Sequence, residues 1–115
     1  WLGVQMQGID ESLSETFRLP VSEGVLVTAV TPGSPAASAG LRGGDRPVVV
    51  DGVSYVLGGD IITRADGDRV TEPEDLSGLV MTKEPGDDLT LEIHRGDSQR
   101  TVNVTLGRRS SETAG

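Results

Sequence analysis

Residues 24–45, GVLVTAVTPGSPAASAGLRGGD, contain a strand, a helix and the turns that connect them. The segment 24–30 is apolar and rich in Val, which favours a strand. Ser34 is a preferred N-cap residue, Pro35 suits the first helical position, and Gly40 suits the residue that ends a helix. The stretch therefore predicts a strand over 24–30, then a short helix between Ser34 and Gly40, then a turn over 42–45.

Further strands are indicated on both sides of this stretch. Residues 2–6 form a short predicted strand with Leu2, Val4 and Met6 on one face. Two apolar runs surround Asp51-Gly52, a pair suited to a type I′ turn, and so predict a hairpin. The remaining predicted strands are 61–64, 89–95 and 100–106, and the last two alternate and are expected to pair as a hairpin.

The clearest predicted helix lies within residues 71–87. Thr71 and Glu74 have the spacing of a capping box, and Pro85-Gly86 is expected to end the helix. One helical face carries Leu76, Leu79, Val80 and Lys83. A weaker helix is predicted within 10–20, capped by Asp10 or Ser12 and ended by Pro20.

These elements predict an α+β fold with five to seven short strands and two or three helices. The helices do not alternate regularly with the strands, which excludes a doubly wound sheet. We expect a small, mostly antiparallel β-sandwich or partial barrel that the helices cap. A chain of 115 residues suits one domain, and residues 108–115 lack an apolar pattern, so we expect a disordered tail there. The chain does not begin with Met, which suggests a piece of a longer protein.

The composition argues against several classes of function. The net charge is −8 and the sequence has no basic stripe, so we expect no binding to nucleic acid. No apolar run approaches the length of a membrane span, and we expect no membrane contact by this chain. Cysteine is absent and there is one histidine, so neither a Cys-based nor a two-His metal site is possible. No cofactor is expected.

No catalytic set is visible, and we expect a non-enzymatic domain. The histidine, His94, lies in an alternating strand and is expected to point outward, and the sequence contains no G-x-S-x-G motif. Asp66, Asp68 and Glu72 offer carboxylates, but the glycine is second rather than sixth as a calcium loop requires. Solvated turn residues explain them, and an acidic calcium-binding module remains an alternative.

The first residues, Trp1-Leu2-Gly3-Val4, suggest a binding site. A glycine at the third position lets successive backbone N–H groups converge on one point, as in a nest that binds an anion or a terminal carboxylate. The strand that follows could accept an added strand, and its apolar side chains could form a pocket. An ordinary core strand is the alternative interpretation.

Several segments together resemble the PDZ domains of the HtrA/DegP family of trypsin-like serine proteases. They are WLGV at the start, LP before GVLV, PGSPAA with AGL and GD, and GGDII followed by DG, a helix and a final hairpin. The resemblance covers nearly the whole chain and implies a PDZ domain over 1–107. Two features depart from it: an inserted hairpin at about 46–60, and Arg64 where an aliphatic residue is expected.

The resemblance implies a module that captures C-terminal residues of polypeptides by β-strand addition and regulates or targets substrates of an attached protease. Its partners would be C-termini or unfolded chains with a hydrophobic last residue, and the parent protease domain. An extracytoplasmic location, periplasmic or at the cell envelope, is implied by the family alone. The alternative is an oligomerisation or docking element whose groove holds its own or a neighbouring chain. The implied peptide-binding residues are Trp1, Leu2, Gly3, Val4, Gln5 and Met6, with Ser77 and Val80 on the 73–83 helix and Pro73 at its entrance. Leu76 is added as a candidate from its helical spacing, which leaves open whether it lines the pocket or the core.

Overall fold

A computed structural model describes residues 1–107, which form eight strands and three helices. The predicted tail, 108–115, lies outside the described residues. None of the helices within 1–107 is long and apolar enough to cross a membrane. The strands are β1 (Val4–Ile9), β2 (Gly24–Val30), β3 (Arg46–Val50), β4 (Val53–Leu57), β5 (Ile61–Ala65), β6 (Asp68–Arg69), β7 (Asp88–Arg95) and β8 (Ser98–Thr105), and the helices are α1 (Glu11–Phe17), α2 (Pro35–Ala39) and α3 (Pro73–Met81).

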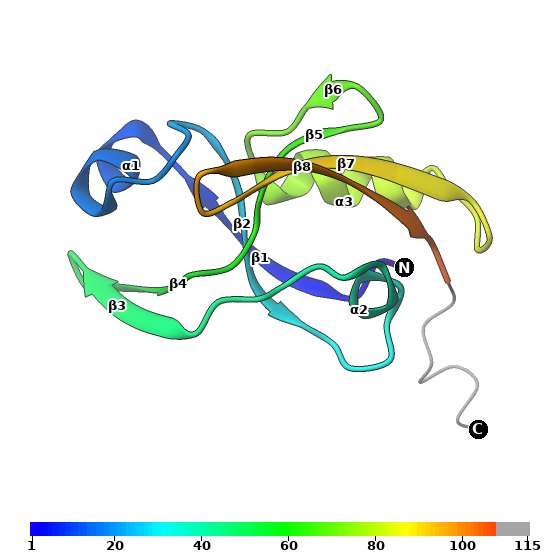
Figure 1. Cartoon of the computed structure of the whole chain (residues 1–115), viewed down its shortest axis with the longest axis horizontal. Coiled ribbons are helices and arrows are strands. Elements are labelled where there is room, and N and C mark those ends of the chain that lie inside the picture. The colour runs from blue at the N-terminus through cyan, green and yellow to red at the C-terminus, as the bar shows by residue number, and fades with distance from the viewer. Residues whose placement is uncertain (108–115) are drawn as a thin grey trace.

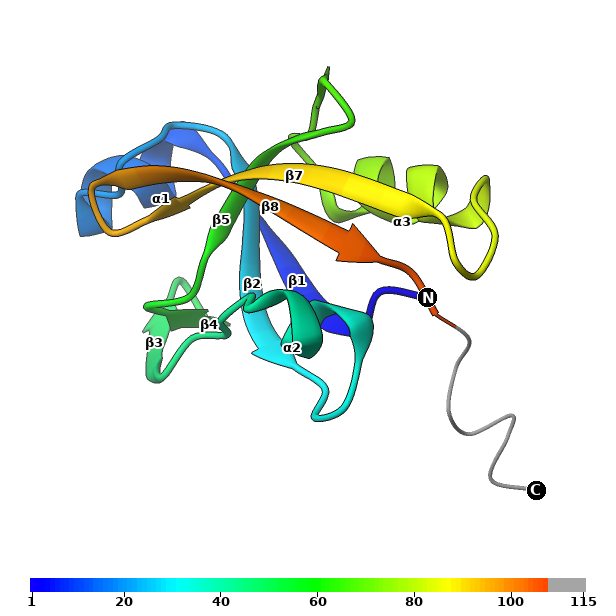
Figure 2. The same cartoon turned by 45° about the vertical axis from the view of Figure 1, so that its right-hand side comes forward.

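The main sheet is antiparallel, with the strand order β1-β2-β5-β7-β8. The short β6 pairs with β5, and β3 and β4 form a separate two-stranded sheet. Figures 1 and 2 show β8 crossing over β2, with α2 below β8 and α3 behind β7. The predicted small, mostly antiparallel α+β fold is therefore confirmed, and its sheet does not close into a barrel.

Strand β2, second in the strand order, is buried on both of its faces over its first four residues. Val25 and Val27 belong to the larger apolar cluster, with Ile62, Leu76, Leu91 and Ile93. Leu26, on the opposite face, belongs to a second cluster with Leu13 of α1 and Leu57 of β4. Burial on both faces explains why residues 24–30 are apolar without alternation.

The α2 helix forms as predicted. The Ser34 hydroxyl caps it by accepting a hydrogen bond from the Ala37 N–H at 3.2 Å, and Pro35 occupies the first turn. Gly40 ends the helix with φ 91°, in the left-handed region that glycine adopts without strain.

The predicted ends of the other two helices need correction. The α3 helix begins one residue later than expected, with Glu72 rather than Thr71 as N-cap, because the residue before Pro73 must be extended. It ends at Met81, before Pro85-Gly86. Asp10 caps α1 as predicted, but the helix ends at Phe17, where Arg18 takes a left-handed conformation, and not at Pro20.

Strand β1 begins at Val4 rather than at Leu2 because Gly3, with φ +90°, turns the chain. The two-residue β6 was not predicted.

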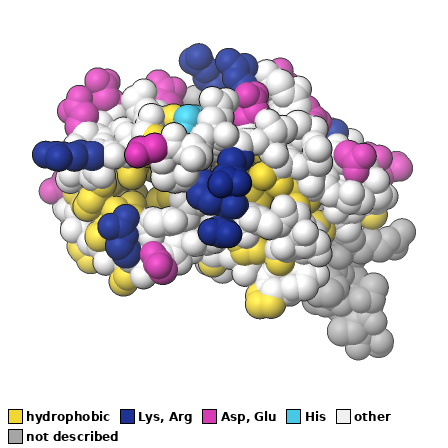
Figure 3. All heavy atoms as spheres, viewed as in Figure 1, with side chains coloured by type: hydrophobic (Ala, Val, Ile, Leu, Met, Phe, Trp, Pro, Cys, Tyr) yellow, Lys and Arg dark blue, Asp and Glu magenta, His cyan; other side chains and the backbone are white. Residues whose placement is uncertain are grey.

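The 46–60 insertion is the predicted hairpin, and both Asp51 and Gly52 have the positive φ of a type I′ turn. Val49 of this hairpin is 70% exposed, and Figure 3 shows apolar side chains over the same end of the molecule.

His94 is more covered than its strand position predicted. It lies in β7 opposite Ile61 of β5 and Gln99 of β8, and its side chain is half-buried. Its Nδ1 atom is buried without a hydrogen-bond partner among the described residues.

The segment that leads into β5 crosses β2 at very short range. A Cβ atom at Gly59 would lie 2.1 Å from the Val27 carbonyl oxygen, so no other residue fits there. The next side chain, Asp60, is 1% exposed. Its carboxylate accepts hydrogen bonds from Arg95 Nε and Nη2, both at 2.8 Å, and from the Arg42 N–H at 3.0 Å.

We predict opposite effects for alanine at two glycines. Gly59→Ala should lower the free energy of unfolding by at least about 3 kcal/mol, because the added methyl group has no space beside Val27. Gly78→Ala should raise it by about 0.5–1 kcal/mol, since Gly78 lies inside α3 with nothing near its Cβ position. Urea denaturation measures both changes, and a similar effect at the two sites would contradict the close crossing.

Candidate functional site

A groove of about 400 Å³ runs between β1 and α3. Apolar side chains line both of its walls. Leu2, Val4 and Met6 lie on the side of β1, and Leu76 and Val80 lie on the side of α3. The two walls run in opposite directions, because a Cβ atom at Gly8, near the end of β1, would lie 3.5 Å from Pro73, at the start of α3. The C-terminal end of α3 therefore lies beside residues 1–3.

Residues 1–3, which we call the anchor loop, have every backbone carbonyl bonded to the protein. The Trp1 oxygen accepts a hydrogen bond from the Gly107 N–H at 3.2 Å. The Leu2 oxygen accepts from the Ala36 N–H at 3.0 Å, and the Gly3 oxygen accepts from the Thr31 N–H at 2.9 Å. The sequence around α2 thus holds two of the three carbonyls.

These bonds fix the direction of the next three amides. In a trans peptide plane the C=O and the following N–H point in opposite directions. The N–H groups of Leu2, Gly3 and Val4 are therefore turned away from the donors that bind the preceding carbonyls. Within residues 1–107, the Leu2 and Gly3 N–H groups donate no backbone hydrogen bond. Such free, adjacent amides are suited to an anion.

Only glycine fits at the middle of the anchor loop. Gly3 has φ +90°, and a Cβ atom there would lie 2.3 Å from Cβ of Ser34. Ser34 is itself buried as the N-cap of α2. The anchor loop and the first turn of α2 are therefore packed backbone against side chain, with no space between them.

Strand β1 also has a free edge. It lies at the end of the strand order, with β2 on one side, and its other edge faces the groove. An edge strand presents unpaired N–H and C=O groups that can pair with another extended chain. The groove therefore combines free amides at one end, a strand edge along its length and an apolar floor.

This combination agrees with the comparisons. The family model described as "PDZ domain" matches residues 1–106. The chain is a PDZ domain. Its relatives include a "Probable periplasmic serine endoprotease DegP-like" of Rhizobium meliloti, 30% identical over 97% of this chain and 19% of the relative. Another is "Protease Do-like 1, chloroplastic" of Arabidopsis thaliana, 37% identical over 78% of this chain and 20% of the relative.

A solved structure supports the same family. The PDZ domain of HtrA3, bound to a phage-derived ligand of sequence FGRWV, superposes with a TM-score of 0.66. It is 27% identical, and the match covers 91% of this chain and 82% of that one. The curated relatives are much longer, and this PDZ domain spans about a fifth of their length.

The PDZ groove is lined by the residues expected from the sequence except Gln5 and Pro73. Gln5 is exposed, and Pro73 lies beside Gly8 at the other end of β1. Leu76 is fully buried and serves both the groove floor and the core, whereas Leu79 packs on the core alone. Two lining residues, Met81 and Lys83, were not predicted as site residues. Lys83 shares the helical face of Leu76 and Val80, and this spacing was the signal that could have identified it.

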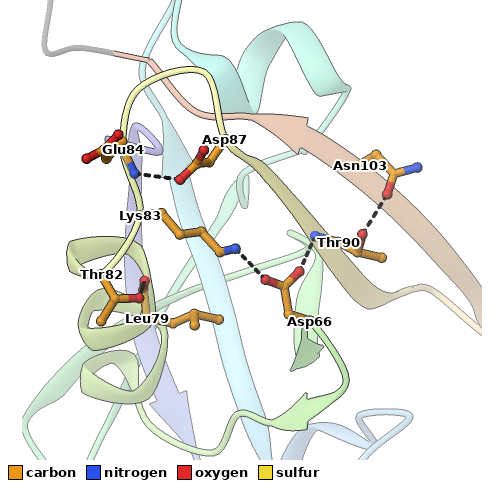
Figure 4. A network of polar contacts seen from close by, with 8 residues as sticks. All are labelled: Asp66, Leu79, Thr82, Lys83, Glu84, Asp87, Thr90 and Asn103. Carbon is orange, nitrogen blue, oxygen red and sulfur yellow. Dashed lines mark hydrogen bonds and ion pairs between the residues drawn. The ribbon is translucent and has the colours of Figure 1, made fainter.

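Lys83 forms an ion pair at the end of the PDZ groove (Figure 4). Its Nζ lies 2.7 Å from Oδ2 of Asp66, in the turn between β5 and β6. Asp66 is held in turn by β7, since its Oδ1 accepts a hydrogen bond from the Thr90 N–H at 2.9 Å. The hydrogen bond to Lys83 is the largest influence that lowers the pKa of Asp66, followed by the bond from Thr90. The bond to Asp66 raises the pKa of Lys83.

A second hollow, of about 510 Å³, lies away from the groove around Thr63, Arg64 and His94. It is larger, but its lining is mainly polar and includes Glu23 as well as Arg64 and Arg69, so it offers no apolar floor. No three potential metal ligands gather anywhere in residues 1–107. The carboxylates of the calcium alternative are thus not assembled, and Asp66 is engaged by Lys83.

The Asp66–Lys83 pair predicts a pH dependence of stability. Because folding lowers the pKa of Asp66, the pair stabilises the fold above the ordinary Asp value of about 3.9 and this contribution is lost as the pH falls through the lowered value. Asp66→Asn should therefore lower the melting temperature at pH 7 and have a smaller effect near pH 2. Thermal melts at both pH values test this, and an unchanged difference would contradict it.

Proposed function

We propose that this PDZ domain captures the C-terminal residues of polypeptides by β-strand addition. The observation that carries the proposal is the anchor loop, in which protein donors hold the carbonyls of residues 1–3 and turn the following amides away. A terminal carboxylate is the anion that these amides suit, because it can be reached by an extended chain lying along β1. The HtrA3 PDZ domain in complex with FGRWV gives a precedent for a short peptide ligand.

In the proposed complex, the last residues of the ligand pair with the edge of β1 over Val4–Gln7. Gln5 contributes through its backbone, which is consistent with its exposed side chain. The side chain of the terminal residue enters the apolar end of the groove, on Leu2, Leu76 and Val80. A hydrophobic terminal residue is the ligand that this floor favours.

The domain acts, in this proposal, as the non-catalytic part of an HtrA-like serine protease. The DegP-like and Do-like relatives are named as proteases, and this chain matches about a fifth of each. Capture of a C-terminus would regulate the attached protease or target substrates to it. We place the parent protein outside the cytoplasm, as the name of the periplasmic relative suggests. The net charge of −8 supports protein rather than nucleic-acid partners.

The proposal predicts a dependence on a free carboxylate. FGRWV should bind with a Kd at least about tenfold lower than its C-terminal amide, which corresponds to about 1.4 kcal/mol. Fluorescence polarisation with an N-terminal dye measures both. Gly3→Pro should abolish the binding of either peptide, because Pro cannot adopt φ +90° and replaces one of the amides.

Two results would contradict the carboxylate mechanism. One is equal affinity for the acid and the amide, and the other is undiminished binding by Gly3→Pro that circular dichroism shows to be folded. Light scattering of the domain with and without residues 108–115 is the control for self-occupancy. An assembly that changes from oligomer to monomer when these residues are removed would favour a groove that holds a neighbouring chain.

A further inference from the structure

Lys83 lies at the end of the groove that contains the anchor loop. The antiparallel arrangement of β1 and α3 places Pro73 beside Gly8, so the residues after α3 lie beside Gly3. Lys83 lines the same hollow as Trp1, Leu2 and Gly3. It is the one basic side chain in that lining.

The surroundings of Lys83 are acidic. Asp66 accepts its hydrogen bond, and Asp87 and Asp88 lie close enough to raise its pKa further, so the ammonium stays charged at neutral pH. These aspartates do not line the groove themselves, so Lys83 is the charged side chain that a carboxylate entering this end would meet.

The two partners of the ion pair differ in freedom (Figure 4). Asp66 is fixed by two backbone bonds to Thr90, one from its own N–H at 2.7 Å and one to its Oδ1 at 2.9 Å. Lys83 holds its charge at the end of a flexible four-carbon stem with three donors. Lys83 can therefore turn toward a new acceptor while Asp66 remains in place.

We infer that Lys83 is a specificity residue that selects a free terminal carboxylate over an uncharged terminus, and that Asp66 competes with the ligand for its ammonium. This inference rests on the proposed function, because it assigns a role within the same groove. The anchor-loop amides donate hydrogen bonds to the carboxylate, whereas Lys83 responds to its charge. The two contributions can thus be separated by experiment.

The test measures Kd for FGRWV and for its amide with the unmodified domain, Lys83→Met and Asp66→Asn. Met keeps an unbranched side chain of similar length without the charge. Lys83→Met should reduce the acid-to-amide preference about three- to fivefold, the scale of an exposed ion pair, because loss of the ammonium weakens binding of the acid more than binding of the amide. Asp66→Asn should increase that preference, because the ammonium loses its internal competitor. Lys83→Arg is the matched control and should retain the preference.

The alternative is that the Lys83–Asp66 ion pair only stabilises the packing of the end of α3 against the β5–β6 turn. In that case Lys83→Met and Asp66→Asn would weaken the acid and the amide to the same degree, and this result would overturn the inference. An unchanged preference in Lys83→Met would also overturn it. A domain that does not prefer the acid at all would instead refute the proposed function, so the two failures are distinguishable.

Discussion

The buried residue Asp60 joins three separate parts of the chain through its carboxylate and its backbone carbonyl. It accepts hydrogen bonds from the side chain of Arg95 in β7 and from the backbone of Arg42 after α2, while the Asp60 carbonyl accepts one from the Val27 N–H of β2. A buried charge is tolerated only when it is paired and fully hydrogen-bonded, so these donors must come together when the chain folds. The close crossing at Gly59 makes this arrangement possible, because it brings the chain into contact with β2.

The groove depends on the same segment that is central to the fold. The turn and first helical turn over 31–36 supply the donors that hold the anchor loop, and the cap residue Ser34 contacts Gly3. Leu76 in turn belongs to both the core and the groove floor. The groove is therefore formed by residues that also pack the core and the α2 helix.

Much of the fold could be predicted because its signals are local. Ser34, Pro35 and Gly40 specify α2 through the chemistry of helix ends, and Asp51-Gly52 specifies its hairpin turn. The features that were missed depend on residues distant in sequence. Lys83 meets Asp66 only because α3 packs beside the β5–β6 turn, and the half-burial of His94 depends on the strands on either side of it. For the site, local pattern and family resemblance located the groove, whereas its charged end required the three-dimensional arrangement.

The bonded carbonyls of the anchor loop have a thermodynamic meaning for recognition. A loop that orders only when a ligand arrives loses backbone entropy at that moment, and the loss reduces the observed affinity. Here Gly107, Ala36 and Thr31 fix the loop during folding of the domain itself. The amides are thus preorganised, and in the proposed complex the entropy of ordering would be lost by the peptide alone. Short and otherwise unstructured chain ends would be usable ligands under that condition.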